Sequence, residues 1–270
     1  DVGGAFESAT ATVTVEDSVD PLVVTQNITI QLDENGNAST TASAVNNGST
    51  DNCTEQANLI LALDKTAFTC ADLGENTVTL TVTDASGNQS AAVATVTVED
   101  GVVPNVITKD IVVQLDASCN ATIAAASVND GTTDNCTDAG SLNLSLDKAT
   151  FTCSDLGVNT VTLTAEDASG NTATATASVT VEDNIVPTVM TKDITVNLDI
   201  TGNVLILASD INDASVDNCT SQNSLTLSID INTFTVTDVG ANTVTLTVED
   251  ESGNSNTATS TVTVVNKLSQ

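Results

Sequence analysis

The sequence predicts an all-β protein, a tandem array of three immunoglobulin-like β-sandwich domains in an elongated rod. The main indication is a set of motifs that recur at a step of 83 residues. These are DNCT, beginning at Asp51, Asp134 and Asp217, and one phenylalanine per repeat, at Phe68, Phe151 and Phe234. A fixed period of this size indicates a tandem array, and 83 residues suffice for a domain with its own core.

Alternation of apolar and polar residues predicts the strands of each domain. In the first repeat we expect strands near 22–32, 38–44, 58–63, 66–70, 77–83 and 90–98. Turn-forming clusters such as DENGN at 33–37 and DASGN at 84–88 separate them. No segment has a convincing helical stripe. Short strands at this spacing favour a Greek-key sandwich with Phe68 as its largest core residue.

The repeat register also predicts the domain boundaries. We call residues 18–100, 101–183 and 184–266 repeats 1, 2 and 3, and 267–270 form a tail. Residues 1–17 align with 84–100, so they are expected to be the terminal strand of a preceding repeat. A lone strand can also complete the sheet of another subunit as a donor strand. Without an initiator Met or a signal segment, the chain is expected to be a mature piece of a longer protein.

Charge excludes several classes of partner. The chain has 36 acidic residues against five Lys and no His, a net charge of −31. Nucleic acid and anionic lipid both need clustered basic residues, so neither is an expected partner. No apolar run is long enough to insert into a membrane. The acids are expected either to keep the surface solvated or, for a subset, to bind a divalent cation.

The cysteines predict disulfides and therefore an oxidising, extracellular location. We expect Cys53 to pair with Cys70 and, in repeat 2, Cys136 to pair with Cys153, because each pair flanks a hairpin. A zinc site is disfavoured by the C-x16-C spacing and the absence of histidine. Val236 stands at the corresponding position of repeat 3.

Two cysteines fall outside this pattern. Cys119 lies in the turn expected at the C-terminal end of repeat 2, and Cys219 lies at the N-terminal end of repeat 3. These ends meet in a tandem array, which predicts a Cys119–Cys219 bond across the junction. The alternative is two free cysteines.

The motifs DNCT, FTC-x-DLG-x-NTVTLT and TVTVED-x3-P, in that order, resemble the tandem repeats of giant surface adhesins of gliding Bacteroidota, the SprB type. The DASGN hairpin and the terminal VTVED are more loosely similar to hyalin-repeat and bacterial Ig-like domains. The resemblance implies an outer-membrane-anchored surface filament, exported by the type IX system, that supports adhesion or gliding motility. Val236, Cys119 and the missing final Glu-Asp depart from the pattern.

No catalytic set is expected, because a nucleophile–base arrangement cannot be assembled without histidine, so the chain is predicted not to be an enzyme. Calcium is the predicted cofactor. The loop at 46–56 and the hairpin at 84–88 should share one end of the domain with the preceding linker, gathering oxygen ligands at each junction. The candidate ligands are Glu16, Asp17, Asp20, Asp51 and Asp84 at the first junction, Glu99, Asp100, Asp134 and Asp167 at the second, and Glu182, Asp183, Asp217 and Asp250 at the third.

The leading functional interpretation is a structural stalk segment. Each sandwich should be about 35–40 Å long, so three in line would make a rod of about 110–120 Å. Its expected partners are neighbouring repeats of the same long chain, with surface glycans or the outer-membrane motility machinery engaged by other regions. The alternatives are repeats that bind a glycan or protein ligand directly, and a pilin-like subunit assembled by donor strand. Ser18, in Asp17-Ser18-Val19, matches the O-glycosylation pattern of the same phylum.

Overall fold

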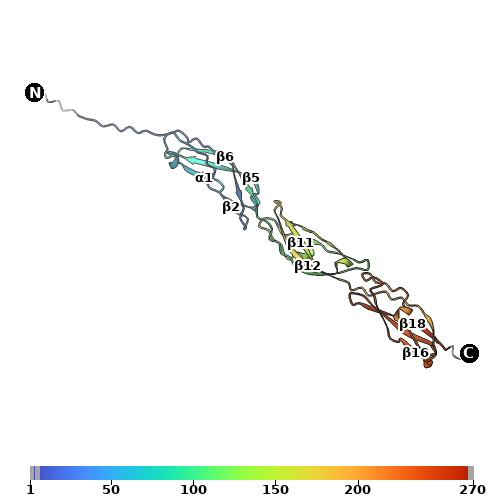
Figure 1. Ribbon diagram of the computed structural model, residues 1–270. Helices are drawn as coiled ribbons and strands as arrows, with labels where there is room; N and C mark the ends of the chain where they lie inside the picture. Colours follow the sequence, from blue (N-terminus) through green and yellow to red (C-terminus); the bar gives the residue numbers. More distant parts are fainter. Residues whose placement is uncertain (1–2, 4–6, 267–270) are drawn as a thin grey trace. The chain divides into compact units, whose positions relative to one another are not determined.

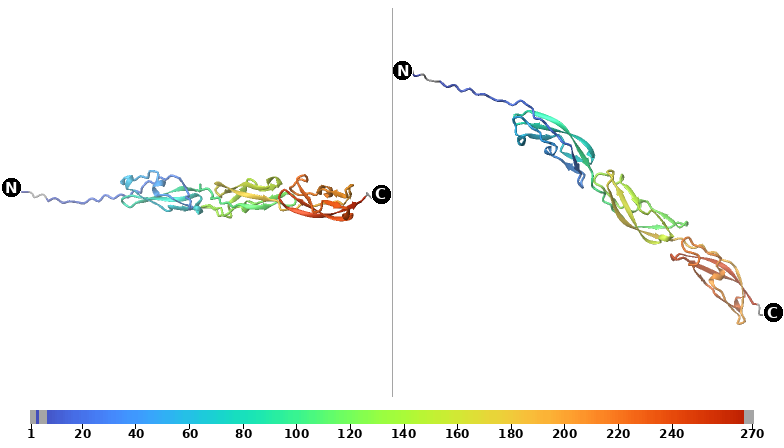
Figure 2. Two further views of the ribbon diagram at one scale, coloured as in Figure 1. Left: turned by 60° about the horizontal axis from the view of Figure 1, so that its bottom comes forward. Right: turned by 45° about the horizontal axis from the view of Figure 1, so that its top comes forward.

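The computed structural model describes residues 3 and 7–266. It confirms a nearly all-β chain with three groups of sheets, which are three tandem immunoglobulin-like sandwiches. Figure 2 shows the strands gathered into three groups that follow the colour order of the sequence. The predicted tail at 267–270 and part of the predicted N-terminal strand (residues 1–2 and 4–6) lie outside the described residues.

Repeat 1 contains a four-stranded sheet in the order β1-β6-β5-β3 and a two-stranded ribbon of β2 and β4. Its elements are β1 Ile28–Gln31, β2 Asn37–Ser39, α1 Ala42–Val45, η1 Gln56–Asn58, β3 Ile60–Leu63, β4 Ala67–Thr69, η2 Cys70–Asp72, β5 Gly74–Thr83 and β6 Gln89–Glu99. The first strand pairs with the last in parallel, while β5 and β6 form the long antiparallel hairpin (Figure 1).

The other repeats follow the same plan, with the sheet orders β7-β12-β11-β9 and β13-β18-β17-β15. The elements of repeat 2 are β7 Ile111–Gln114, β8 Asn120–Thr122, α2 Ala125–Val128, β9 Asn143–Leu146, β10 Thr150–Thr152, η3 Cys153–Asp155, β11 Gly157–Glu166 and β12 Thr172–Glu182. Those of repeat 3 are β13 Ile194–Asn197, β14 Asn203–Leu205, α3 Ala208–Ile211, β15 Thr226–Ile229, β16 Thr233–Thr235, η4 Val236–Asp238, β17 Gly240–Glu249 and β18 Ser255–Val265.

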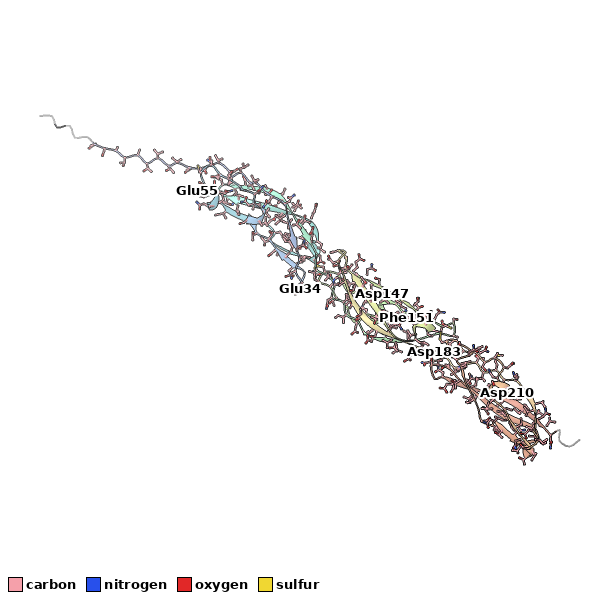
Figure 3. The ribbon with its side chains drawn as sticks, in the orientation of Figure 1. Glu34, Glu55, Asp147, Phe151, Asp183 and Asp210 are labelled. Atoms are coloured by element: carbon pink, nitrogen blue, oxygen red, sulfur yellow. A yellow bond between two sulfur atoms is a disulfide. The ribbon has the colours of Figure 1, made fainter. Side chains whose placement is uncertain are left out.

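The cores are built by the period-two alternation of the long hairpins. Along β5 the side chains of Val78, Leu80 and Val82 are buried, and the threonines between them are half-buried on the other face. Phe68 of β4 is fully buried against this sheet, and Phe151 (Figure 3) and Phe234 do the same in the other repeats. The predicted role of the single phenylalanine is therefore confirmed.

Two predicted strands are shorter than expected. The segment predicted as a strand over 22–32 makes isolated bridges at Leu22 and Thr25 before β1 begins at Ile28. The predicted strand at 38–44 ends at Ser39 and passes into α1. The Thr41 hydroxyl accepts the N–H of Ala44 at 3.2 Å, and this side-chain cap favours a helical turn over continued extension.

Residues 7–17 pair with no strand of the described chain. Val13 and Val15 are 82% and 91% exposed, whereas Val96 and Val98, which occupy the same register in β6, are buried. That this segment belongs to another sheet, of a preceding repeat or of a second copy, stays a prediction.

Contacts divide the chain into two compact units. The first runs to Asn105 and also includes Thr133–Asn143 and Glu166–Ala173, two N-terminal loops of repeat 2. The second contains Val106–Thr132, Leu144–Ala165 and the chain from Thr174 onward. Each unit therefore contains one complete junction between consecutive repeats. Within the described residues, no helix has the length and apolarity needed to cross a membrane.

Candidate metal centres and junction disulfides

Three aspartates meet at the N-terminal end of every repeat. In each trio one carboxylate oxygen from each aspartate lies within 4.8 Å of the other two. The trios are Asp17, Asp51 and Asp84; Asp100, Asp134 and Asp167; and Asp183, Asp217 and Asp250. The first member of each trio is the last residue before a repeat boundary, so the second and third trios join residues of consecutive repeats.

Local turn chemistry positions these carboxylates. One oxygen of Asp134, Oδ2, accepts the N–H groups of Cys136 and Thr137 at 3.0 and 2.8 Å, which folds the DNCT loop around it. Asp167 follows β11 and closes the last hairpin by accepting the backbone N–H of Asn171 at 2.8 Å. The side chain of Asn171 then donates to the carbonyl of Asp100 at 3.0 Å and holds the linker against the hairpin.

The same turns recur at the other two trios. In the first trio, the hairpin aspartate is Asp84, and its pKa is shifted. Burial acts to raise the pKa of Asp84, but hydrogen bonds from the side chain and backbone of Asn88 and from the N–H groups of Gly87 and Ser86 outweigh it. The net effect lowers the pKa, so this carboxylate is charged at neutral pH.

Each trio leaves buried oxygen atoms without a hydrogen-bond donor. In the second trio these are Asp100 Oδ2, Asp134 Oδ1 and, beside them, Oδ1 of Asn135. Asp100 is 8% exposed and its counterpart Asp183 is 4% exposed. Buried polar atoms are nearly always paired, and carboxylates gathered out of water repel one another. A cation bound among them would satisfy both requirements.

The ligand chemistry matches calcium. All candidate donors are carboxylate or amide oxygens, the hard ligands that Ca²⁺ takes in sets of six to eight, whereas zinc prefers nitrogen and sulfur. The Asn side chains of DNCT, Asn135 and Asn218, are ligand candidates that the sequence analysis did not name individually. Each of these asparagines directly follows a trio aspartate in the sequence, and this position could have indicated them as ligands.

The structure gathers nine of the predicted ligands and leaves four aside. Glu16 and Asp20 are exposed and belong to no trio. Glu99 and Glu182 instead accept the side-chain amides of Gln31 and Gln114, each at 2.7 Å. They end β6 and β12 on the outward face of the strand, because the residue after them, Asp100 or Asp183, points inward. Ser18, the predicted glycosylation site, is exposed, and its modification stays a prediction.

The predicted disulfide pairing is wrong. The bonds are Cys70–Cys136 and Cys153–Cys219, each linking one repeat to the next, while Cys53 and Cys119 are free. Residues 58–70 do not form the single hairpin on which the predicted pairing depends. The strands β3 and β4 belong to different sheets, and β4 pairs with β2 so that Thr69 faces Asn37. The chain therefore delivers Cys70 to the C-terminal end of its repeat, away from Cys53.

The predicted Cys119–Cys219 bond is also wrong, although a disulfide does cross the junction of repeats 2 and 3. Cys219 binds Cys153, and Cys119 lies beside them, with the three sulfur atoms within 4.8 Å of one another. In repeat 3, Val236 occupies the corresponding position and is 57% exposed.

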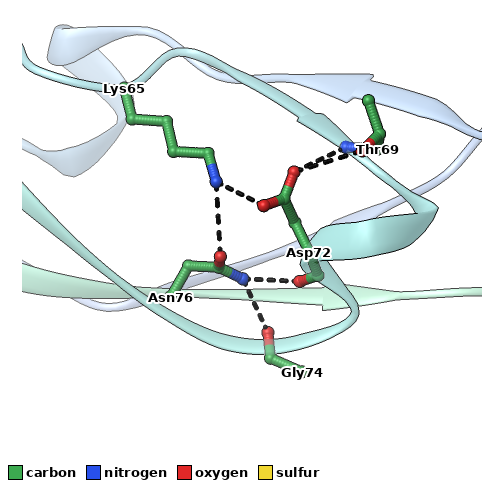
Figure 4. A network of polar contacts seen from close by, with 5 residues as sticks. All are labelled: Lys65, Thr69, Asp72, Gly74 and Asn76. Carbon is green, nitrogen blue, oxygen red and sulfur yellow. Dashed lines mark hydrogen bonds and ion pairs between the residues drawn. The ribbon is translucent and has the colours of Figure 1, made fainter.

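A polar network of Lys65, Thr69, Asp72 and Asn76 supports the turn that begins at Cys70 (Figure 4). Cys70 is the first residue of η2. In that turn, Asp72 accepts a hydrogen bond from the N–H of Thr69 at 2.9 Å and forms an ion pair with Lys65. Lys65 also lies 4.8 Å from the centre of the Phe68 ring, which anchors it on the core. Repeat 2 repeats this arrangement with Lys148 and Asp155, whereas repeat 3 has Ile231 at the lysine position.

This network predicts acid sensitivity. The hydrogen bond from Lys65, followed by that from the backbone of Thr69, lowers the pKa of Asp72. A lowered folded-state pKa adds stability above the unfolded value of about 4, and this stability is lost as the pH falls through the folded value. We expect Asp72→Asn to be less stable than the parent at pH 7. The urea midpoints of parent and variant, measured by circular dichroism, should converge as the pH falls toward 2. Asp20→Asn, at an exposed site, serves as the control, and parallel curves at every pH would contradict the prediction.

Comparisons with known proteins identify no family. No family model and no curated protein matches the chain. Solved structures that match include the protocadherin gammaB4 extracellular domain, with 13% identity and a TM-score of 0.36 over 93% of this chain, which spans 50% of that one. Mouse cadherin-23 EC22-24 matches at 12% identity and a TM-score of 0.38, covering 92% of this chain and 99% of that one. Titin domains I67–I69 match at 10% identity and a TM-score of 0.38, covering 91% of this chain and 98% of that one.

Proposed function

We propose that this chain is a stalk segment of a secreted cell-surface adhesin, in which calcium and disulfides fasten each repeat to the next. One observation carries the proposal: the junction of repeats 1 and 2 combines an interdomain disulfide with an aspartate trio drawn from both repeats. The junction of repeats 2 and 3 repeats this arrangement at the same step in the sequence. Such fastening serves a spacer, whose function is to keep its two ends apart.

The chemistry of the junction supports an extracellular, non-enzymatic role. Disulfides persist in oxidising compartments, and calcium is abundant outside cells, where modules bind it with dissociation constants of about 10⁻⁴–10⁻³ M. The motif resemblance to SprB-type adhesins supports a place on the surface of a gliding bacterium and export by the type IX system. In this proposal adhesion to surface glycans, and contact with the motility machinery, belong to other regions of a longer protein.

Small-angle X-ray scattering tests the stalk. We expect the chain in millimolar calcium to have a maximum dimension consistent with repeats held in line, about 110–120 Å plus any terminal extension. Chelation with EDTA should lower the mean dimension, because the disulfides alone leave each junction free to bend about the bond. A Cys53→Ser background removes the exposed free thiol, which could otherwise link two molecules during the measurement. Identical scattering curves with and without calcium would contradict calcium as a fastener.

A further inference from the structure

The junction of repeats 2 and 3 contains one sulfur more than its disulfide needs. Cys119 has a free thiol, half-buried, whose sulfur lies within 4.8 Å of both Cys153 and Cys219. Its Sγ donates to the carbonyl oxygen of Asn218 at 2.7 Å, which keeps the thiol next to the bonded pair. A thiol held against a disulfide is the starting arrangement of thiol–disulfide exchange.

The backbone at Cys119 shows that this cysteine occupies a position suited to glycine. Its φ is +64°, in the left-handed region that non-glycine residues rarely adopt. The equivalent residues of the other repeats are Gly36 and Gly202, with φ of +72° and +79°. The first junction therefore has the same disulfide and the same turn without a third sulfur, which makes it an internal control.

The strand register indicates which bond an exchange would form. In the ribbon of β8 and β10, Asn120 faces Thr152, so the next residues outward are Cys119 and Cys153. Cys119 lies in the turn before β8 and Cys153 opens η3, so neither is itself a strand residue. At the equivalent positions of repeat 1, a Cβ added to Gly36 would lie 2.5 Å from Sγ of Cys70, so the two side chains are close enough for a disulfide. A Cys119–Cys153 bond would therefore form inside repeat 2 without moving another repeat.

We propose that Cys119, Cys153 and Cys219 form an exchange site that moves the disulfide from between repeats 2 and 3 to within repeat 2. The Cys119 thiol releases its proton to water, and the thiolate attacks Sγ of Cys153. The Cys119–Cys153 bond forms, the Cys153–Cys219 bond breaks, and Cys219 leaves as a thiolate that takes a proton from water. One disulfide and one thiol are present before and after, so no oxidant or reductant is consumed.

The consequence is a junction that can be released while the neighbouring one stays locked. Release of Cys219 leaves repeat 3 attached to repeat 2 through the linker and the trio of Asp183, Asp217 and Asp250. The exchange itself rests on the sulfur geometry alone, while its mechanical meaning rests on the proposed stalk function.

Peptide mapping of the full chain tests the exchange. In a Cys53→Ser background the protein is incubated at pH 6, 7 or 8, quenched with acid, alkylated and digested without reduction. We expect Cys119–Cys153 peptides beside Cys153–Cys219 peptides, with alkylated Cys219 rising as alkylated Cys119 falls.

Two variants make the result decisive. In Cys119→Gly we expect only Cys153–Cys219 and no alkylation of Cys219, the same behaviour as Cys70–Cys136 in every digest. In Cys219→Ser, oxidative refolding should produce the Cys119–Cys153 bond. Free Cys119 and Cys153 in that variant, a Cys119–Cys219 bond in the parent, or alkylation confined to Cys119 at every pH would overturn the proposal. These outcomes do not depend on scattering, so failure of the stalk proposal would be recognised separately.

Discussion

Replacing Cys70 and Cys136 together by serine is expected to lower the free energy of unfolding of the linked repeats by about 4 kcal/mol. The bond closes a loop with a sequence separation of 66 residues, and the chain-entropy model assigns a loop of this size about that stabilisation. For domains of this length the loss corresponds to a fall in melting temperature of about 15 °C or more. Calorimetry of the full chain in EDTA would measure it without a contribution from calcium.

The matched control is Cys53→Ser. Cys53 occupies the same DNCT position as Cys136 but is exposed and unbonded, so its replacement should leave the melting curve unchanged. Both cysteines are replaced in the test variant because a single substitution would leave a reactive thiol. A double variant that melts with the parent would show that the bond adds nothing to the folded junction, and equal effects of the test and control substitutions would point to the DNCT loop itself.

Asp134→Asn is expected to change stability with opposite signs in the absence and presence of calcium. Without the ion, the substitution removes one of three like charges, each of which has an oxygen within 4.8 Å of the others, so the melting temperature should rise. With calcium at a hundred times its dissociation constant, a bound site adds about 2.7 kcal/mol to the parent. The variant loses that gain at the second trio, so it should then melt below the parent.

Calorimetric titration provides a second readout of the same prediction. The three trios predict three calcium ions per chain for the parent and two for Asp134→Asn. Glu75→Gln removes one negative charge at an exposed position of β5, outside the trios, and should keep the full stoichiometry. A destabilising effect of Asp134→Asn of the same size with and without calcium would instead assign Asp134 a purely structural role as the cap of its loop.

The repeat architecture was predictable from sequence because it depends on local, periodic signals. Alternation along GENTVTLTVT determines which face of β5 is buried, and a one-residue slip would expose Val78, Leu80 and Val82 to water. The predicted trio aspartates were also within reach of sequence reasoning. They lie in turns and linkers whose order along the chain places them at the same end of a sandwich, once the strand directions are known.

The disulfide pairing and the choice among neighbouring acids depended on the tertiary structure. Sequence spacing favoured Cys53–Cys70, but β4 crosses to the other sheet and pairs with β2, which carries Cys70 to the next repeat. Glu99 and Asp100 are adjacent in sequence, yet only Asp100 enters the trio, because successive strand residues point to opposite faces. The sequence by itself determined the repeat, the strands and the cores, since these follow from local patterns of burial. Only the tertiary structure decided which cysteines and which oxygens meet, because those contacts join segments that are far apart along the chain.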